Sequence, residues 1–280
     1  MGDSWSSFTV TDAGSNPIGS EPAVIDLGFV GHATVLIDVG GTRILTDPFL
    51  RSRLGPLERH GPLPDPGALR NIDVVLISHG HPDHFDRESL AAIAGAPVVV
   101  VPRGLGAAAR RWTRADVVEM TAGERLRVGE VSIEAVPARH WVTPGSVRAK
   151  PQGYVVDSGP RIWFAGDTGP LPPDLRPAGS IDVALLPVWT WGPHRGPGHL
   201  GPRSAAELLR EIDARVAVPI HWGTLYPRRL HRLWSGPLTE PGDRFAAHAE
   251  RLAPQADIRV LRPRESTTIR LASAPRRQMT

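Results

Sequence analysis

Residues 74–86 read VVLISHGHPDHFD and are the most informative stretch of this chain. Val74–Ile77 is a continuous apolar run, which is typical of a strand buried on both faces of a sheet. The nine residues that follow, Ser78 to Asp86, contain three histidines and two aspartates. Because α/β proteins present their sites where buried strands end, this stretch predicts a site rich in ligand-type side chains at a sheet edge.

The spacing inside this stretch favours metal binding. His79 and His81 are separated by one residue, so in extended backbone they point the same way and could bind one metal ion. Asp83 and His84 continue round the turn and could face a second ion nearby. A polar turn that caps a helix would explain Asp86, but it would not need three histidines.

Three other predicted strands also end in a ligand-type residue. Taken singly, each of these residues could make a structural contact or belong to a turn. Their shared position at strand ends indicates that they join one site. They are His140 after residues 131–136, Asp167 after residues 162–164 and His221 after residues 216–220.

The composition is that of a globular protein whose metal ligands must be histidines and carboxylates. The chain has 280 residues, of which 41% are hydrophobic and 22% charged, and it has no cysteine. A disulfide framework, a thiolate metal site and a cysteine nucleophile are therefore excluded. The formal net charge of +3 is small, and the chain has no basic tract, so we expect no nucleic-acid surface.

The alternation of strands and helices predicts an α/β or α+β fold. We expect an N-terminal arm over residues 1–22, one domain over 23–272 and a loose tail over 273–280. No apolar stretch is long enough to span a membrane and no export signal is visible, so we expect a cytoplasmic location. The expected strands are 35–39, 42–46, 74–77, 98–101, 131–136, 154–156, 162–164, 183–186, 216–220, 258–261 and 267–271, and the expected helices are 87–94, 104–112, 202–212 and 245–252.

Together these motifs resemble the metallo-β-lactamase superfamily. The resemblance extends from about residue 27 to residue 271. Its central motifs are His-x-His-x-Asp-His at 79–84, a single histidine at 140, Gly-Asp-Thr-Gly at 166–169 and a histidine at 221. Residues 31–37 (GHATVLI), 44–48 (ILTDP) and 221–224 (HWGT) look like the branch that holds N-acylphosphatidylethanolamine phospholipase D and ascorbate-6-phosphate lactonase.

The resemblance implies a four-layer αβ/βα sandwich, with two mixed β-sheets face to face, helices outside and the site at one edge. It also implies a hydrolase with two divalent metal ions, zinc in the first place and manganese or iron as alternatives. By this likeness one ion is held by His79, His81 and His140, the second by Asp83, His84 and His221, and Asp167 bridges them. A hydroxide held between the ions would attack a phosphodiester, an ester or a lactone.

Further residues are predicted to act around the metals on a small-molecule or lipid-like substrate. Asp83 would orient the hydroxide, and Asp47 would hold a ligand histidine, although a turn before Pro48 explains Asp47 equally well. In the resembled branch a histidine followed by a proline and a helix lies near the site, which gives His199 a substrate-side or proton-transfer role. The remaining predictions are an apolar substrate wall of Trp141, Trp189, Trp191 and Trp222, a substrate contact at His194 and a structural hydrogen bond for His32.

Several alternatives stay open at this point. A nuclease, a mononuclear iron oxygenase and a non-catalytic metal-binding protein could share the fold. The sequence decides neither between a monomer and a homo-oligomer nor whether residues 50–69 and 226–243 are lids, interfaces or surface loops. Arginines that would suit a sugar phosphate are Arg139, Arg148 and Arg195.

Overall fold

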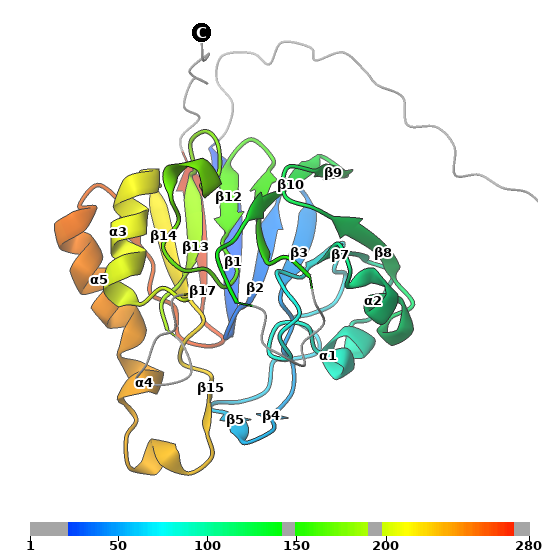
Figure 1. The fold of residues 1–280 in the computed structure, drawn as a ribbon, viewed down its shortest axis with the longest axis horizontal. Coiled ribbons are helices and arrows are strands. Elements are labelled where there is room, and N and C mark those ends of the chain that lie inside the picture. Colours follow the sequence, from blue (N-terminus) through cyan, green and yellow to red (C-terminus); the bar gives the residue numbers. More distant parts are fainter. Residues whose placement is uncertain (1–21, 142–148, 190–197, 272–280) are drawn as a thin grey trace, which may run out of the picture.

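The computed structural model describes residues 22–141, 149–189 and 198–271. Two seven-stranded sheets pack face to face, and helices cover their outer sides (Figure 1). The predicted four-layer arrangement is therefore confirmed. Within the described residues, no helix combines the length and the apolar character needed to cross a bilayer.

The first sheet joins an antiparallel half to a parallel half. In the antiparallel half, the hairpin between residues 34–39 and 42–46 turns at Gly40 and Gly41. Their φ values of 56° and 71° suit glycine. From β3 (Thr42–Thr46) to the far edge of this sheet the strands run parallel to one another. The order is β17 (Ser266–Leu271), β1 (Ala23–Gly31), β2 (Thr34–Val39), β3 (Thr42–Thr46), β6 (Val74–Leu76), β7 (Val98–Pro102) and β8 (Asp116–Met120).

The second sheet is also mixed, and a third, small sheet lies apart from both. The second sheet has the order β16 (Asp257–Ile258), β14 (Val216–Ile220), β13 (Val183–Pro187), β12 (Arg161–Phe164), β11 (Gln152–Asp157), β10 (Val131–Pro137) and β9 (Arg125–Val128). The small sheet consists of β15 (Leu225–Pro227), β5 (Leu57–Arg59) and β4 (Arg53–Leu54).

The helices pack in pairs on opposite sides of the sandwich. One pair, α1 (Arg87–Ala92) and α2 (Gly106–Trp112), covers the first sheet, and the other, α3 (Pro202–Ile212) and α5 (Pro241–Leu252), covers the second. Asp86 caps α1 as predicted, because its side chain accepts a hydrogen bond from the Ser89 amide. The remaining helical turns are η1 (Pro173–Leu175), η2 (Leu230–Arg232) and α4 (Gly236–Thr239).

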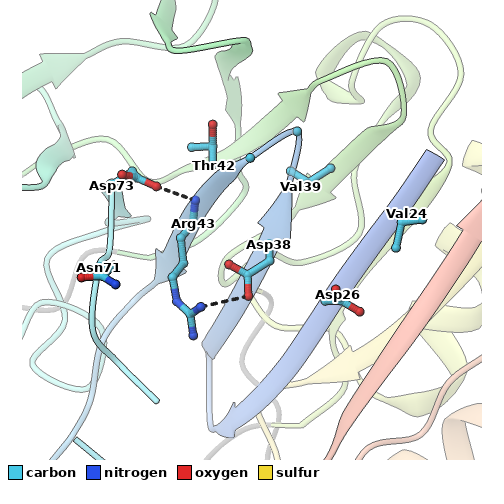
Figure 2. Close-up of a pocket in the computed structure, with 10 residues that line it drawn as sticks. Val24, Asp26, Asp38, Val39, Thr42, Arg43, Asn71 and Asp73 are labelled. Carbon is cyan, nitrogen blue, oxygen red and sulfur yellow. Dashed lines mark hydrogen bonds and ion pairs between the residues drawn. The ribbon is translucent and has the colours of Figure 1, made fainter. Parts of the chain in front are cut away.

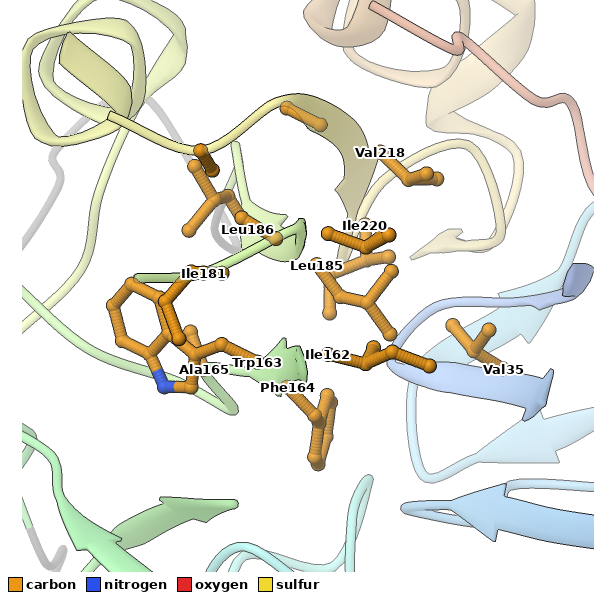
Figure 3. Packing of buried hydrophobic residues seen from close by; sticks show 14 of the residues in the cluster. Val35, Ile162, Trp163, Phe164, Ala165, Ile181, Leu185, Leu186, Val218 and Ile220 are labelled. Atoms are coloured by element: carbon orange, nitrogen blue, oxygen red, sulfur yellow. The ribbon is translucent and has the colours of Figure 1, made fainter. Parts of the chain in front are cut away.

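The core lies between the two large sheets. Along β6, Val74 and Leu76 face this core, whereas Val75 and the adjoining Ile77 face α1 and α2, so the strand is buried on both sides as its apolar run predicted. Figure 3 shows part of the core, with residues of both sheets in one cluster.

The predicted strands and helices are present, with differences at their ends. The helix after Asp86 ends at Ala92, since Ile93 is extended, and the last helix begins early because Pro241 starts it. The predicted strand 258–261 shrinks to β16. Several strands were not predicted, namely β1, β4, β5, β8, β9 and β15. The proposed tail and residues 1–21 of the proposed arm lie outside the described residues.

Candidate metal centre

Seven side chains singled out in the sequence converge at one edge of the sandwich. Four follow β6 of the first sheet, and three follow β10, β12 and β14 of the second. All seven are buried or half-buried. They are His79, His81, Asp83, His84, His140, Asp167 and His221.

A first group of three ring nitrogens faces a common centre. His81 Nδ1 lies 2.8 Å from His79 Nε2 and 3.0 Å from His140 Nε2. At such distances either one ring donates a hydrogen bond to the next or the lone pairs face one another and repel unless a cation lies among them. Three histidine nitrogens are a common zinc ligand set in enzymes, and they leave a fourth position for water or substrate.

Hydrogen bonds at the outer ring nitrogens orient these lone pairs. Ser78 Oγ donates its proton to Asp47 Oδ2 at 2.5 Å. Ser78 Oγ therefore accepts a hydrogen bond from His79 Nδ1, at 2.9 Å. His140 Nδ1 donates to the Gly198 carbonyl at 2.8 Å. A neutral ring that donates through Nδ1 carries its lone pair on Nε2, so both rings turn a lone pair toward the centre.

A second group beside the first includes a carboxylate. His84 Nε2 and His221 Nε2 are 3.2 Å apart. Asp83 Oδ2 lies 3.5 Å from His84 Nε2 and 3.9 Å from His221 Nε2. His84 Nδ1 donates to Asp47 Oδ2 at 2.6 Å, and His221 Nδ1 donates to the Trp189 carbonyl at 2.8 Å. The group therefore offers two imidazole lone pairs and a carboxylate oxygen to a second ion.

Asp167 lies between the two groups. Its Oδ2 is 3.5 Å from His84 Nε2 and 3.9 Å from His140 Nε2, and its Oδ1 is 3.2 Å from His221 Nε2. Asp167 Oδ1 is buried and has no hydrogen bond among the described residues. A buried carboxylate oxygen without a hydrogen bond is unfavourable, and a metal ion would supply its missing partner. The residues present therefore fit bound divalent metal ions.

The charges of the site also fit cations. Burial raises the pKa of Asp83 and of Asp167, but the imidazoles around them outweigh burial and hold both pKa values well below the usual range. Burial lowers the pKa of His84, yet Asp167, Asp83 and Asp47 together raise it well above the usual value. The carboxylates thus draw positive charge into the centre, and bound metal ions would take over this role.

His32 holds Asp83 at the edge of the second group. Its Nε2 lies 3.0 Å from Asp83 Oδ2, and the residue is only 2% exposed. The backbone of His32 has a φ of 59° and is fixed by Thr224 Oγ1, which accepts from the His32 amide at 2.8 Å. This contact agrees with the structural hydrogen bond expected for His32, and the same nitrogen is close enough to join the second group as a ligand.

Asp47 connects the two groups. Its carboxylate accepts from the Ser78 amide at 2.7 Å as well as from Ser78 Oγ and His84 Nδ1. Through Ser78 it therefore also acts on His79. The structure places Asp47 where the sequence predicted a partner for a ligand histidine. Ser78 was missed, because a serine next to a histidine carries no signal of its own.

Asp47→Asn is expected to weaken metal binding by roughly 10- to 100-fold. In the native chain both oxygens of Asp47 accept hydrogen bonds from His84 and Ser78. The asparagine amide would keep one acceptor oxygen and would replace the other with an NH₂ donor. Retention of metal against increasing chelator concentrations measures the loss. Asp38→Asn changes a solvent-facing carboxylate on β2 and should bind metal like the native chain. Equal retention by both variants would show that Asp47 does not hold the ligands.

The residues predicted to contact the substrate lie in different surroundings. His199 Nδ1 is 3.6 Å from Asp167 Oδ2, close enough for His199 to join the ligands or to reach a bound substrate. Trp141 directly follows His140 and is 63% exposed. Trp189 packs partly buried against the core. Trp191, His194, Arg148 and Arg195 lie outside the described residues.

Trp222 belongs to the hydrophobic core instead of the predicted substrate wall. It is 1% exposed, and its ring stacks on Phe29 with 6.4 Å between centroids. Its Nε1 donates to the Pro219 carbonyl at 2.9 Å. A side chain covered in this way cannot contact a substrate, and the residue type alone does not distinguish it from an exposed tryptophan.

Trp222→Ala is expected to lower the free energy of unfolding by about 3–5 kcal/mol, because it leaves a large cavity in the core. Trp141→Ala is the matched control and should change this free energy by less than about 0.5 kcal/mol. Urea unfolding followed by circular dichroism measures both. Native stability in Trp222→Ala would contradict its place in the core.

A hollow lies at the end of the first sheet opposite to the candidate metal ligands. Figure 2 shows its residues around the β2–β3 turn. The Arg43 amide donates to Asp73 Oδ2 at 2.8 Å, and its guanidinium pairs with Asp38 at 3.4 Å. The hollow includes none of the candidate ligands, so we do not assign the chemistry to it.

Comparison with known proteins gives matches over most of the chain. Residues 42–222 match the model of a family described as the β-lactamase superfamily domain. A protein named metal-dependent hydrolase from Methanopyrus kandleri is 32% identical over 254 residues, which cover 85% of this chain and 97% of that protein.

Two further matches concern a yeast enzyme and a solved structure. The mitochondrial N-acyl-phosphatidylethanolamine-hydrolyzing phospholipase D of Saccharomyces cerevisiae is 31% identical over 209 residues, which cover 66% of this chain and 44% of that protein. The structure of Igni18, a metallo hydrolase from Ignicoccus hospitalis, has a TM-score of 0.65 at 20% identity and covers 89% of this chain and 100% of its own. The second match is a likeness of fold alone.

Proposed function

This chain belongs to the metallo-β-lactamase superfamily, and from that premise we propose that it is a metal-dependent hydrolase with two divalent ions, zinc in the first place. The proposal rests on the convergence of two sets of ligand atoms on Asp167, whose Oδ1 is buried without a hydrogen bond among the described residues. One ion would be held by His79, His81 and His140 and the other by Asp83, His84 and His221, with Asp167 shared.

Two divalent ions, when bound, lower the pKa of a water molecule to about 7 and polarise the oxygen of the group under attack. The side chains of this protein would orient the reactants. Asp83, whose Oδ2 is held by His32 Nε2 at 3.0 Å, would accept a hydrogen bond from the attacking water and aim it. His199 is 20% exposed, against 3% for the neighbouring Asp167, so it would face a bound substrate. Burial lowers the pKa of His199 to about 4, so its neutral ring would donate a hydrogen bond to the leaving group and would not carry a proton to it.

For the substrate we propose a phosphodiester ahead of an ester or a lactone. Support comes from the yeast relative, whose name states that it hydrolyses N-acyl-phosphatidylethanolamine and which matches 66% of this chain. The exposed ring of Trp141, next to the ligand candidate His140, offers apolar contact to a lipid-like or other small substrate. Arg139 is exposed beside the same histidine and could meet a phosphate charge.

The proposal is tested by measuring metal content and hydrolysis on one preparation. Elemental mass spectrometry should find at least two metal ions per chain. Bis-p-nitrophenyl phosphate should be hydrolysed faster than p-nitrophenyl acetate, and a chelator should abolish turnover until zinc is restored. Trials with manganese and iron identify the best metal.

Other outcomes would each replace part of the proposal. Fewer than two ions per chain would overturn the dinuclear site. Full metal content without turnover of either ester would favour a metal-binding protein. Oxygen consumption in place of hydrolysis would favour an iron oxygenase, and cleavage of a DNA or RNA oligonucleotide in preference to the small diester would favour a nuclease.

A further inference from the structure

A second cluster of ligand-type side chains lies outside the metal centre. Glu58 is on β5, His60 follows that strand, and His231 is on η2, the helical turn after β15. Figure 1 shows β4, β5 and β15 below the sandwich, apart from the two large sheets. None of the three residues is among the ligands assigned above.

The three side chains face one another. Glu58 Oε1 lies 4.0 Å from His60 Nε2 and 3.9 Å from His231 Nδ1. The two imidazole rings are 4.5 Å apart between centroids and inclined by 63°. One ligand atom from each residue lies within 4.8 Å of the others. Because zinc–nitrogen bonds are about 2 Å long, small side-chain movements would bring all three atoms onto one ion.

The two facing ring nitrogens have no hydrogen bond among the described residues. His60 Nε2 and His231 Nδ1 are both buried, although their side chains are 19% and 33% exposed and the cluster can be reached from solvent. Buried polar atoms are nearly always hydrogen-bonded or ligated. Burial and the neighbouring His231 lower the pKa of His60, which favours the neutral ring that a metal ion binds.

The chemistry of the three side chains favours a transition-metal ion over other ligands. Two imidazoles and one carboxylate are a recurrent ligand set for zinc. Arg228 pairs with Glu58 Oε2 at 4.0 Å, which leaves Oε1 for the cluster. We propose that Glu58, His60 and His231 form a separate site for one divalent transition-metal ion, zinc in the first place.

An ion bound here would fasten the segment that follows His221 to the first half of the chain. Leu225 of β15 pairs with Arg59 of β5, and the His60 amide donates to the Thr224 carbonyl at 2.7 Å. Beyond β15 the segment is exposed to solvent, and 86% of the surface of Leu233 is accessible. His231 lies within this exposed part, so its ligation would tie the far end of the segment to β5. The ion would therefore limit local opening and take no part in the hydrolysis.

Zinc counting tests the site directly. The native chain, His231→Gln, Glu58→Gln and the control His248→Gln are dialysed to equilibrium against the same low zinc concentration, and zinc per chain is measured by elemental mass spectrometry. The native chain and the control should each hold one zinc more than the two cluster variants. This difference does not depend on how many ions the metal centre holds, and turnover should be equal in all four proteins.

Limited digestion with trypsin tests the structural role. Zinc should slow cleavage after Arg228, Arg229 and Arg232 by about tenfold in the native chain and the control, and it should have no such effect in the cluster variants. Equal zinc content in the four proteins would overturn the site, and zinc-independent cleavage of the native chain would overturn its structural role.

If the cluster variants fold poorly, the native chain alone can still test the proposed metal site. Crystals soaked with zinc should then show an anomalous scattering peak among Glu58, His60 and His231. An empty map at this position would overturn the proposal.

Discussion

Asp167→Asn is expected to lower turnover by about 10³-fold or more and to reduce the metal content of the chain. The two oxygens of Asp167 lie near nitrogens of both ligand groups, with Oδ2 3.9 Å from His140 Nε2 of the first group and Oδ1 3.2 Å from His221 Nε2 of the second. An amide of the same shape removes the negative charge between the two ions and places N–H donors where a cation should lie. Turnover and metal content measured on the same preparation check this prediction.

Asp174→Asn is the matched control for this change. Asp174 is an exposed aspartate on η1, downstream of Asp167 along the chain. The control should keep native metal content and turnover. Full metal content with full turnover in Asp167→Asn would contradict its place as the shared ligand.

His81→Ala is expected to lose one metal ion and to lower turnover by on the order of 10²-fold or more. This loss should exceed that of a residue such as Asp47, which only holds a ligand histidine by a hydrogen bond. His81 Nδ1 is the nitrogen that both neighbours approach, at 2.8 Å from His79 Nε2 and 3.0 Å from His140 Nε2. Because His81 is only partly buried, its removal leaves a gap that free imidazole can enter. Added imidazole should therefore restore part of the metal content and part of the turnover.

Recovery with imidazole distinguishes two causes of lost activity in His81→Ala. Imidazole can replace a missing ligand, but it cannot restore a chain that has not folded. His248→Ala removes a histidine on α5 that lies in no candidate ligand group within residues 22–141, 149–189 and 198–271. This variant should behave like the native chain with or without imidazole. Native metal content in His81→Ala would contradict the assignment of His81 as a ligand.

The positions of the candidate ligands could be predicted from the sequence because each depends on a local pattern. The run from Val74 to Asp86 combines a buried strand with a turn full of ligand-type residues, and both are local features of the chain. His140, Asp167 and His221 each follow an apolar strand, so their place at the sheet edge depends on the direction of one strand alone. The local patterns predicted only an α/β or α+β fold, and the two-sheet sandwich was expected from the resemblance to the metallo-β-lactamase superfamily.

The hydrogen bonds that orient these ligands could not be predicted in the same way. The carbonyls of Gly198 and Trp189 accept from His140 and His221, and a backbone carbonyl leaves no trace in the residue type. The contact between His32 and Asp83 joins residues 51 positions apart. Each of these pairs joins two segments that meet at the edge of one sheet but are far apart along the chain, and the sequence of either segment alone does not state that they meet.

The cluster of Glu58, His60 and His231 escaped the sequence for a related reason. Its strands β5 and β15 have three residues each and pair across more than half of the chain. Strands this short show no clear alternation of apolar and polar residues. Nothing in the sequence around His60 and His231 therefore indicates that the two residues meet.

Anomalous scattering from zinc-loaded crystals tests the central claim most directly, because it locates each ion as well as counting it. The expected map has two peaks about 3.5–4 Å apart at the metal centre, one among the nitrogens of His79, His81 and His140 and one beside Asp83, His84 and His221. Asp167 should contact both peaks. A single peak, or none, at this edge of the sandwich in fully zinc-loaded and active protein would contradict the two-metal hydrolase.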